Sequence, residues 1–246
     1  MTGRGFAARG ALLAGLFFAC AAPTAATAQP SREACFSGDG GVSLDLRIDV
    51  CTRLIDSGAL PQDSLAVAFQ NRGTAFLEKG DTDRAIEDYG RAIGIDPNYA
   101  NAFNSRGVAY QAKGDNERAI ADYDQAIRLA PDDANALNGR CWLRAALGQL
   151  ETALADCNES LRLRPNSSNA LDSRGFVHLR LGRWDEALAD SEAALAANPN
   201  NAWALYERGF AKLRKGDSVG GDADIEASRA IDPKAEMEFA GFGMRR

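Results

Sequence analysis

The sequence predicts an all-α fold, a solenoid built from five helix hairpins. Two observations lead to this prediction. Prolines recur every 34 residues, at Pro97, Pro131, Pro165, Pro199 and Pro233. Within one such period, small and apolar residues fall at steps of three and four in two separate stretches, which indicates two short helices. A fixed period of roughly 20 to 50 residues is typical of stacked units that bury their apolar faces only against their neighbours.

The second unit shows how each hairpin is expected to form. Its small and apolar positions are Ala100, Phe103, Gly107 and Tyr110 in the first helix, and Ala119, Ile120, Tyr123, Ala126 and Ile127 in the second. Gly114 ends the first helix, because glycine adopts a positive φ at low cost. Asp115 or Asn116 then caps the second helix, and Pro131 closes it. Asp132 or Asp133 offers a cap for the helix that follows.

An arginine and an aspartate also recur once in every unit. The two columns are Arg72, Arg106, Arg140, Arg174 and Arg208, and Asp88, Asp122, Asp156, Asp190 and Asp224. A ligand is not periodic, so contacts to a ligand should differ from unit to unit. We therefore interpret these columns as bidentate bridges that hold the scaffold together, a role that lysine fills poorly.

The repeated residues resemble the tetratricopeptide-repeat family. The positions that carry the resemblance are Gly73, Gly107, Gly175 and Gly209, Ala85, Ala119, Ala153 and Ala187, the aromatic residues Phe76, Tyr110, Tyr89 and Tyr123, and the proline column. Five units are covered within residues 66–233, at about 66–99, 100–133, 134–167, 168–201 and 202–235. The resemblance implies a right-handed superhelix whose first helices line a concave groove, and a role in binding proteins or peptides.

Residues 1–28 lie outside the repeats and have the pattern of a secretory signal peptide. Two arginines precede an apolar stretch at 11–22, and Ala-Thr-Ala ends at Ala28. The apolar stretch is shorter than the ~20 residues that a membrane-spanning helix needs. A lipoprotein acylated at Cys20 is the alternative, although the two phenylalanines before Cys20 fit that processing poorly. We expect export to the periplasm or the cell exterior.

The charge and the motifs exclude several function classes. The whole chain has a net charge of −6, and removal of residues 1–28 leaves 26 basic against 34 acidic residues, a net charge of −8. A chain of this sign lacks the basic stripe that binds nucleic acid or anionic lipid. His178 is the only histidine, and no nucleophile, phosphate-loop or metalloprotease motif occurs. We expect no catalytic site, no cofactor and no metal, and we expect proteins or neutral to basic peptides as partners.

Four cysteines remain after cleavage, in two pairs that share a separation of 16 residues: Cys35 with Cys51, and Cys141 with Cys157. Cys141 takes the place of the repeated glycine and Cys157 the place of a repeated tyrosine. In the family these two columns face each other across the hairpin. We predict both pairs as disulfides, each contributing about 3 kcal/mol. Two alternatives remain: buried reduced cysteines, and a thiol-exchange enzyme that uses Cys141 and Cys157.

The ends of the array are expected to differ from the repeats. Residues 29–65 form an N-terminal cap, a partial repeat in which 43–56 is a helix and the disulfide from Cys35 to Cys51 fastens the Gly-rich segment before it. Residues 234–246 form a tail, in which Met237, Phe239 and Phe242 make a short closing turn.

The groove is where partner contacts are expected. One column of the first helices runs Gln70, Asn104, Asn138, Asp172 and Tyr206. The candidate residues are the amides Asn101, Asn104, Asn135 and Asn138, which can bind an extended backbone, and the aromatics Trp142, Phe176, Trp203, Tyr206 and Phe210, which would supply buried area. The alternative is that these rings pack between units. We predict a non-catalytic interaction scaffold; self-assembly through the apolar end of the groove is a further possibility.

Overall fold

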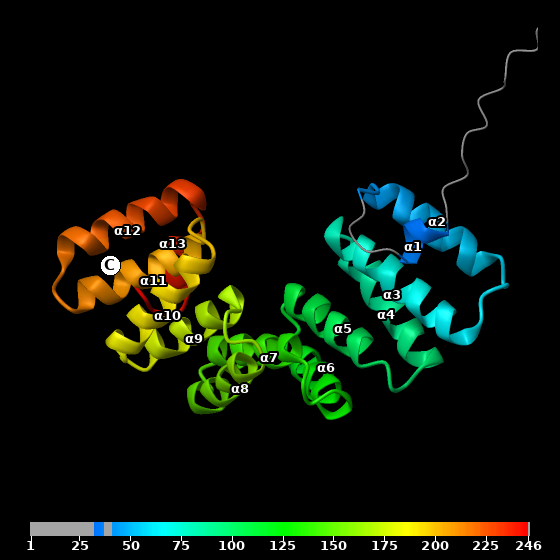
Figure 1. Cartoon of the computed structure of the whole chain (residues 1–246), viewed down its shortest axis with the longest axis horizontal. Helices are drawn as coiled ribbons and strands as arrows, with labels where there is room; N and C mark the ends of the chain where they lie inside the picture. Colours follow the sequence, from blue (N-terminus) through cyan, green and yellow to red (C-terminus); the bar gives the residue numbers. More distant parts are fainter. Residues whose placement is uncertain (1–31, 37–40, 246) are drawn as a thin grey trace, which may run out of the picture.

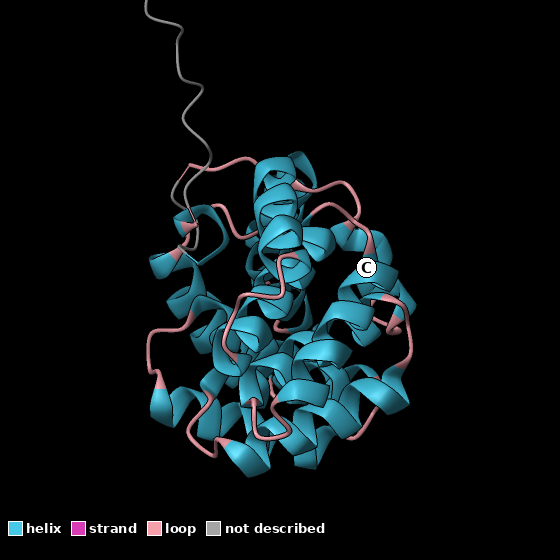
Figure 2. Ribbon diagram, turned by 90° about the vertical axis from the view of Figure 1, so that its right-hand side faces the viewer, coloured by secondary structure: helices cyan, strands magenta, loops and turns pink. Residues whose placement is uncertain are grey.

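The computed structural model describes residues 32–36 and 41–245, and this part of the chain is helical with no strand (Figure 2). The predicted signal peptide, with Cys20, lies outside the described residues. The bounds of the helices are α1 Glu33–Phe36, α2 Leu44–Asp56, α3 Gln62–Glu78, α4 Thr82–Ile95, α5 Ala100–Ala112, α6 Asn116–Leu129, α7 Ala134–Ala146, α8 Leu150–Leu163, α9 Ser168–Arg180, α10 Trp184–Ala197, α11 Ala202–Arg214, α12 Ser218–Ile231 and α13 Ala235–Gly241.

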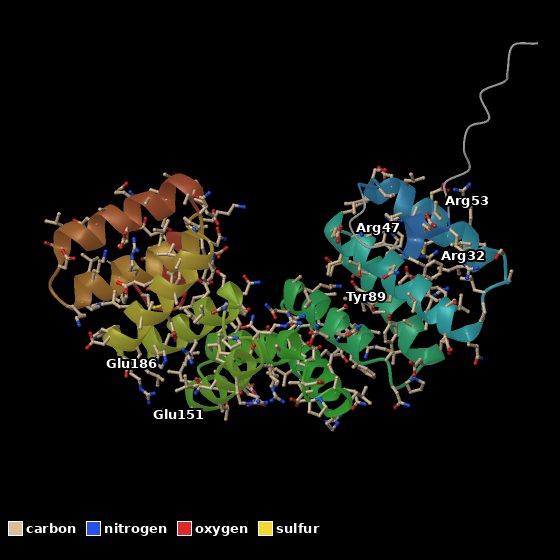
Figure 3. The ribbon with its side chains drawn as sticks, viewed as in Figure 1. Arg32, Arg47, Arg53, Tyr89, Glu151 and Glu186 are labelled. Carbon is tan, nitrogen blue, oxygen red and sulfur yellow. A yellow bond between two sulfur atoms is a disulfide. The ribbon has the colours of Figure 1, made fainter. Side chains whose placement is uncertain are left out.

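Five hairpins, α3–α4 to α11–α12, stack in chain order and form the predicted solenoid (Figure 1). The first helices α3, α5, α7, α9 and α11 contact one another from hairpin to hairpin. Among the described residues, the second helices contact only first helices and α13. The array therefore bends with the first helices on its inner side. Glu151 of α8 and Glu186 of α10 lie on the outer side of the resulting arch (Figure 3).

The turns form as the sequence predicts. Gly114 has a φ of 77° and ends α5, and the side chain of Asp115 accepts a hydrogen bond from the Arg118 backbone N–H at 3.2 Å. Asp133 caps α7 through the Asn135 backbone N–H, at 2.9 Å. A left-handed glycine thus follows the first helix of every hairpin. The second helices α4, α6 and α12 start with an aspartate cap, whereas α8 and α10 start at Gln149 and Arg183 without a side-chain cap.

Close packing inside a hairpin depends on the repeated glycines. A Cβ added to Gly73 would lie 2.9 Å from Cε1 of Tyr89, and one added to Gly107 would lie 3.0 Å from Cε1 of Tyr123. Both tyrosines are 1% exposed. A larger residue at Gly73 would force Tyr89 to move, because a contact of 2.9 Å essentially never occurs for a real Cβ, and one at Gly107 would require Tyr123 to shift by a few tenths of an ångström.

The arginine and aspartate columns form bidentate ion pairs, which confirms their structural interpretation. The pairs are Arg72–Asp88, Arg106–Asp122, Arg140–Asp156, Arg174–Asp190 and Arg208–Asp224, with N–O distances of 2.6–2.8 Å. All five aspartates are buried. Each pair joins the first helix of a hairpin to the second helix of the same hairpin.

Both predicted cysteine pairs are disulfides in the structure. Cys35–Cys51 joins α1 to α2, and Cys141–Cys157 joins α7 to α8. All four cysteines are at most 1% exposed. The cap helix α2 begins after Ser43, whose side chain accepts a hydrogen bond from Leu46. The Asn71 side chain then ties the cap to the first hairpin by donating to the carbonyl of Cys35 at 2.9 Å.

Candidate partner-binding groove

The inner side of the arch is partly filled by the chain itself. The segment that follows α12 turns back over the first helices, and its rings meet those that the sequence analysis assigned to a partner. The ring of Phe239 stacks on Tyr206 with centroids 4.4 Å apart. Phe242 meets Phe176 edge to face at 5.0 Å. The Tyr206 hydroxyl donates to the backbone carbonyl of Met244 at 3.3 Å.

The expectation that five aromatic rings would face a partner is therefore wrong for three of them. Phe176, Tyr206 and Phe210 are 1%, 1% and 3% exposed. The C-terminal segment covers Phe176 and Tyr206, while Phe210 packs between hairpins against Trp184, with ring centroids 6.3 Å apart. Phe176 is accordingly a core residue, and its replacement would test stability instead of binding.

The other two rings, Trp142 and Trp203, are half-buried. Trp203 contacts Phe239 at 4.7 Å between centroids, so the C-terminal segment also covers part of it. Trp142 contacts Phe242 at 6.3 Å but still lines an open pocket. Met237, expected to join the closing turn, is 69% exposed and takes no part in this cluster.

The open part of the groove is a pocket of about 380 Å³ between α5, α7 and α9. Its lining residues are Val108, Gln111, Tyr123, Ala134, Asn135, Asn138, Gly139, Trp142, Ser167, Asn169, Asp172 and Ser173. Three predicted site residues, Asn135, Asn138 and Trp142, therefore come together here. Asn101, which is exposed, and Asn104, which is half-buried, lie on α5 and are not part of the lining.

Three amide oxygens at equivalent positions of successive repeats have no hydrogen-bond partner among the described residues. They are Oε1 of Gln70, Oδ1 of Asn104 and Oδ1 of Asn138, and all three atoms are buried. A buried acceptor without a donor costs on the order of 1–3 kcal/mol. Asn135 differs, because its Oδ1 accepts a hydrogen bond from Arg164 at 3.0 Å. Asn104 and Asn138 thus have acceptor capacity to spare, as does Gln70 in the first hairpin.

Tyr123 forms part of the pocket wall and was missed as a site residue. Its hydroxyl donates to Oε1 of Gln111 at 2.9 Å, and its ring packs against Gly139, where an added Cβ would lie 2.7 Å from Cζ. Burial raises the pKa of Tyr123, so the phenol stays protonated. The periodic tyrosine column indicated a core residue, and the ring is indeed buried; Gly139 leaves the space that it occupies beside the pocket.

Asp172 is the acidic group of the pocket. Asn201 supports it from α11, with Nδ2 donating to Oδ1 at 3.3 Å. Burial raises the pKa of Asp172 to about 7, against the smaller opposite effect of that hydrogen bond. Sequence reasoning placed Asp172 in the groove column but did not select it. The signal was available, since it is the only acid in a column of amides that ends in Tyr206.

A second hollow, of about 430 Å³, lies beside the first and shares Val108, Gln111 and Trp142 with it. Its remaining lining residues are Ala112, Asn116, Leu143, Ala146, Leu147 and Phe242. This hollow is mainly apolar, and Phe242 forms its boundary with the C-terminal segment. Trp142 therefore stands between a polar and an apolar compartment of the same groove.

The described residues contain no group of three or more His, Cys, Asp or Glu side chains placed to hold a metal ion. In that same part of the chain no helix is long and apolar enough to cross a membrane. His178 is buried, with Nε2 3.8 Å from Oδ2 of Asp190, and burial lowers its pKa. The imidazole is therefore neutral at pH 7 and packs within the fourth hairpin.

Comparison with known proteins gives matches to family profiles and to solved structures. A profile described as "TPR repeat" matches residues 73–114 and 177–216, and one described as "Tetratricopeptide repeat" matches residues 100–133. No curated protein sequence matches the chain.

Solved structures with a similar fold cover most of the chain. YrrB, described as a TPR protein with an unusual peptide-binding site, is 20% identical, with a TM-score of 0.58 over 80% of this chain and 99% of YrrB. A tetratricopeptide repeat protein from Parabacteroides merdae has 18% identity and a TM-score of 0.63 over 82% of each chain. MamA from Desulfovibrio magneticus RS-1 has 16% identity and a TM-score of 0.59, over 71% of this chain and 97% of MamA. At these identities the likeness establishes the fold alone.

Proposed function

The chain is a tetratricopeptide-repeat protein, and we propose that it acts as a non-catalytic scaffold that binds a peptide or an extended segment of a partner protein in its groove. One observation carries this proposal. Asn138 lines the pocket between α5, α7 and α9, its buried Oδ1 has no hydrogen-bond partner among the described residues, and Asn104 of the preceding repeat has an unpartnered Oδ1 at the equivalent position. Backbone N–H groups of an extended segment are the donors that such a row of acceptors fits.

The shape of the groove supports a short segment over a folded surface. The open pocket lies in the middle of the inner side, and the C-terminal segment already covers Phe176 and Tyr206 beyond it. A ligand would therefore bind over α5, α7 and the near side of α9. The described peptide-binding site of YrrB, a structure of the same fold, agrees with this type of ligand.

The buried disulfide between α7 and α8 supports a role without thiol chemistry. Cys141 and Cys157 are both 0% exposed and bonded to each other. An exchange reaction requires a thiolate that can reach the second sulfur, so cysteines of this kind are inert. The aromatic surface that self-assembly would use is likewise covered by the C-terminal segment.

Export to the periplasm or the cell exterior is part of the proposal. Two disulfides fit an oxidising compartment, and residues 1–28 have the pattern of a signal peptide. The mass of the chain isolated from the cell envelope tests this directly. We expect an N-terminus at Gln29; a fatty-acylated Cys20 would show lipid anchoring instead, and an intact Met1 would contradict export.

The binding function can be tested with peptides selected from a random library on the wild-type protein. We expect Asn138→Ala to weaken the selected peptides by roughly ten-fold, a loss that corresponds to about 1.4 kcal/mol. The matched control is Asn166→Ala, which removes the same group from an exposed loop position. Calorimetric titration of both variants gives the affinities, and circular dichroism verifies that helicity is unchanged.

Two outcomes would contradict the proposal. Selection that yields no peptide competing for one site would remove the groove as a binding surface. Equal affinities for Asn138→Ala, Asn166→Ala and the wild type would place binding elsewhere on the molecule.

A further inference from the structure

Asp172 differs from the repeated aspartates of this protein in having no basic partner. The five aspartates of the repeated column are each bonded to an arginine of their own hairpin. Among the described residues, the hydrogen-bond partner of the Asp172 carboxylate is the neutral amide of Asn201. No lysine, arginine or histidine of the described part of the chain lines its pocket. A carboxylate in such a place costs free energy until a cation joins it.

The other walls of the pocket also suit a cation. Asn138 contributes an oxygen that is buried and without a donor, and Trp142 contributes the edge or face of an indole. A carboxylate, an amide oxygen and an aromatic ring together form the group set that recognises an ammonium or a guanidinium. The Tyr123 hydroxyl is already engaged with Gln111, so it adds no competing donor toward Asp172.

We propose that this pocket is a subsite for a lysine or arginine side chain of the bound segment. The carboxylate of Asp172 serves as its counter-ion, Oδ1 of Asn138 accepts one of its N–H groups, and Trp142 covers the alkyl stem. The inference rests on the proposed function, because it assigns a side chain to the segment that the groove binds. The net charge of −6 on the whole chain favours approach of a basic segment.

Asn201 holds Asp172 in position, because its Nδ2 donates to Oδ1 of Asp172 at 3.3 Å. Glu207 is a second acidic neighbour, and burial, followed by the charge of Asp172, raises the pKa of Glu207. Asn201 caps α11 through the backbone N–H groups of Trp203 and Ala204 at 3.0 and 3.1 Å, which fixes its side chain. The carboxylate is thus pre-oriented by residues that a ligand does not touch.

The test uses Nα-acetyl-lysine methylamide as probe, with its Nε-acetylated form as the neutral counterpart. The readout is the indole N–H resonance of Trp142, assigned by a Trp142→Phe variant. We expect a saturable shift with the ammonium compound and binding at least about ten-fold weaker for the acetylated compound. Asp172→Asn should remove this preference. It keeps the shape of the side chain and removes a buried charge, so it should fold as well as the wild type.

Glu186→Gln is the control for long-range charge, because Glu186 is exposed on the outer side of the arch (Figure 3) and carries the same charge as Asp172. It should leave the preference intact. Equal shifts from the two compounds, an unchanged preference in Asp172→Asn, or no saturable shift from either compound would each overturn the inference. In all three cases the library peptides can still lose affinity in Asn138→Ala, so the proposed function is judged separately.

Discussion

The carboxyl group of Glu207 lies against Gly175 of the preceding repeat, where a Cβ added to the glycine would come within 2.5 Å of Oε2. In the first two hairpins the equivalent glycine is covered by the ring of Tyr89 or Tyr123. The fourth hairpin has Ser191 in the position of that tyrosine. Glu207 therefore fills a space that a shorter side chain left open.

Glu207 gives the stability of the protein a dependence on pH. It is 0% exposed, and neither oxygen has a hydrogen-bond partner within residues 32–36 and 41–245. Burial, and then the charges of Asp172 and Asp190, raise its pKa well above the usual 4.5. A carboxyl group with a raised pKa in the folded state stabilises the fold below its unfolded pKa and loses this contribution as the pH rises through the folded value. The free energy of unfolding should therefore fall as the pH rises above about 4.5.

Glu207→Gln should be more stable than the wild type at neutral and alkaline pH and should have a flatter pH profile. Urea unfolding followed by circular dichroism between about pH 5 and about pH 8 measures both effects. Asp172, whose pKa is raised to about 7, contributes a slope of the same sign, so part of the dependence should persist. Glu186→Gln is the exposed control; a profile of Glu207→Gln that parallels that of Glu186→Gln would show that Glu207 titrates normally.

Removing the aspartate of an ion pair between two helices should lower the free energy of unfolding strongly. Asp156 accepts hydrogen bonds from Arg140 and also from Nη1 of Arg144, at 2.7 Å. Asp156→Ala should destabilise the protein by about 3–5 kcal/mol, because it leaves two arginines without their buried partner. Chemical unfolding gives the value. Glu159→Ala breaks an exposed pair with Arg162 and should change little; equal effects of the two variants would argue against a structural ladder.

The disulfide between α7 and α8 should stabilise the middle of the array. We expect the double variant Cys141→Ala and Cys157→Ala to lose about 3 kcal/mol, the loop-closure contribution for a short loop. Thermal unfolding measures this loss. Alkylation of the unreduced, denatured protein should modify none of the four described cysteines, whereas four modified thiols would show that they are reduced.

Phe239 should anchor the C-terminal segment in the groove. It is 0% exposed and touches Tyr206, Trp203 and Phe176. Phe239→Ala should cost roughly 3–5 kcal/mol if the segment stays in place. Trp203 would become more exposed if the segment detaches, which a red shift of tryptophan emission would report. Met237→Ala is the control, because Met237 is 69% exposed, and it should change neither stability nor emission. If Phe239→Ala also changed neither, the segment would not be bound in the groove.

Periodicity was enough to predict the repeated part of the molecule. The period of the prolines predicted the helix hairpins. The arginine and aspartate columns predicted ion pairs such as Arg140–Asp156, because each repeat places its residues in the same environment. The pairing of Cys141 with Cys157 followed from the resemblance to the tetratricopeptide repeats, because in that family the two columns that these cysteines occupy face each other inside the hairpin.

Features that break the period were not predictable in this way. Pro233 lies one period after Pro199, so the first helix of a further hairpin would follow it if the repeat continued. The chain beyond Pro233 instead turns back and buries Phe176 and Tyr206. Column analysis assigns a residue to the inner side but does not show what covers that side. Asp172 stands out in the sequence as the acid in a column of amides, but only the structure shows that the described residues lining its pocket include no basic side chain.

The hydrogen bond from Tyr206 to the carbonyl of Met244 has a practical consequence for how the protein is handled. Because Met244 is held against α11 of the fifth hairpin, an affinity tag fused behind the last residues would pull on the segment that covers Tyr206. Immobilisation through the opposite end of the chain leaves that segment undisturbed, and it is the orientation in which capture assays should be built.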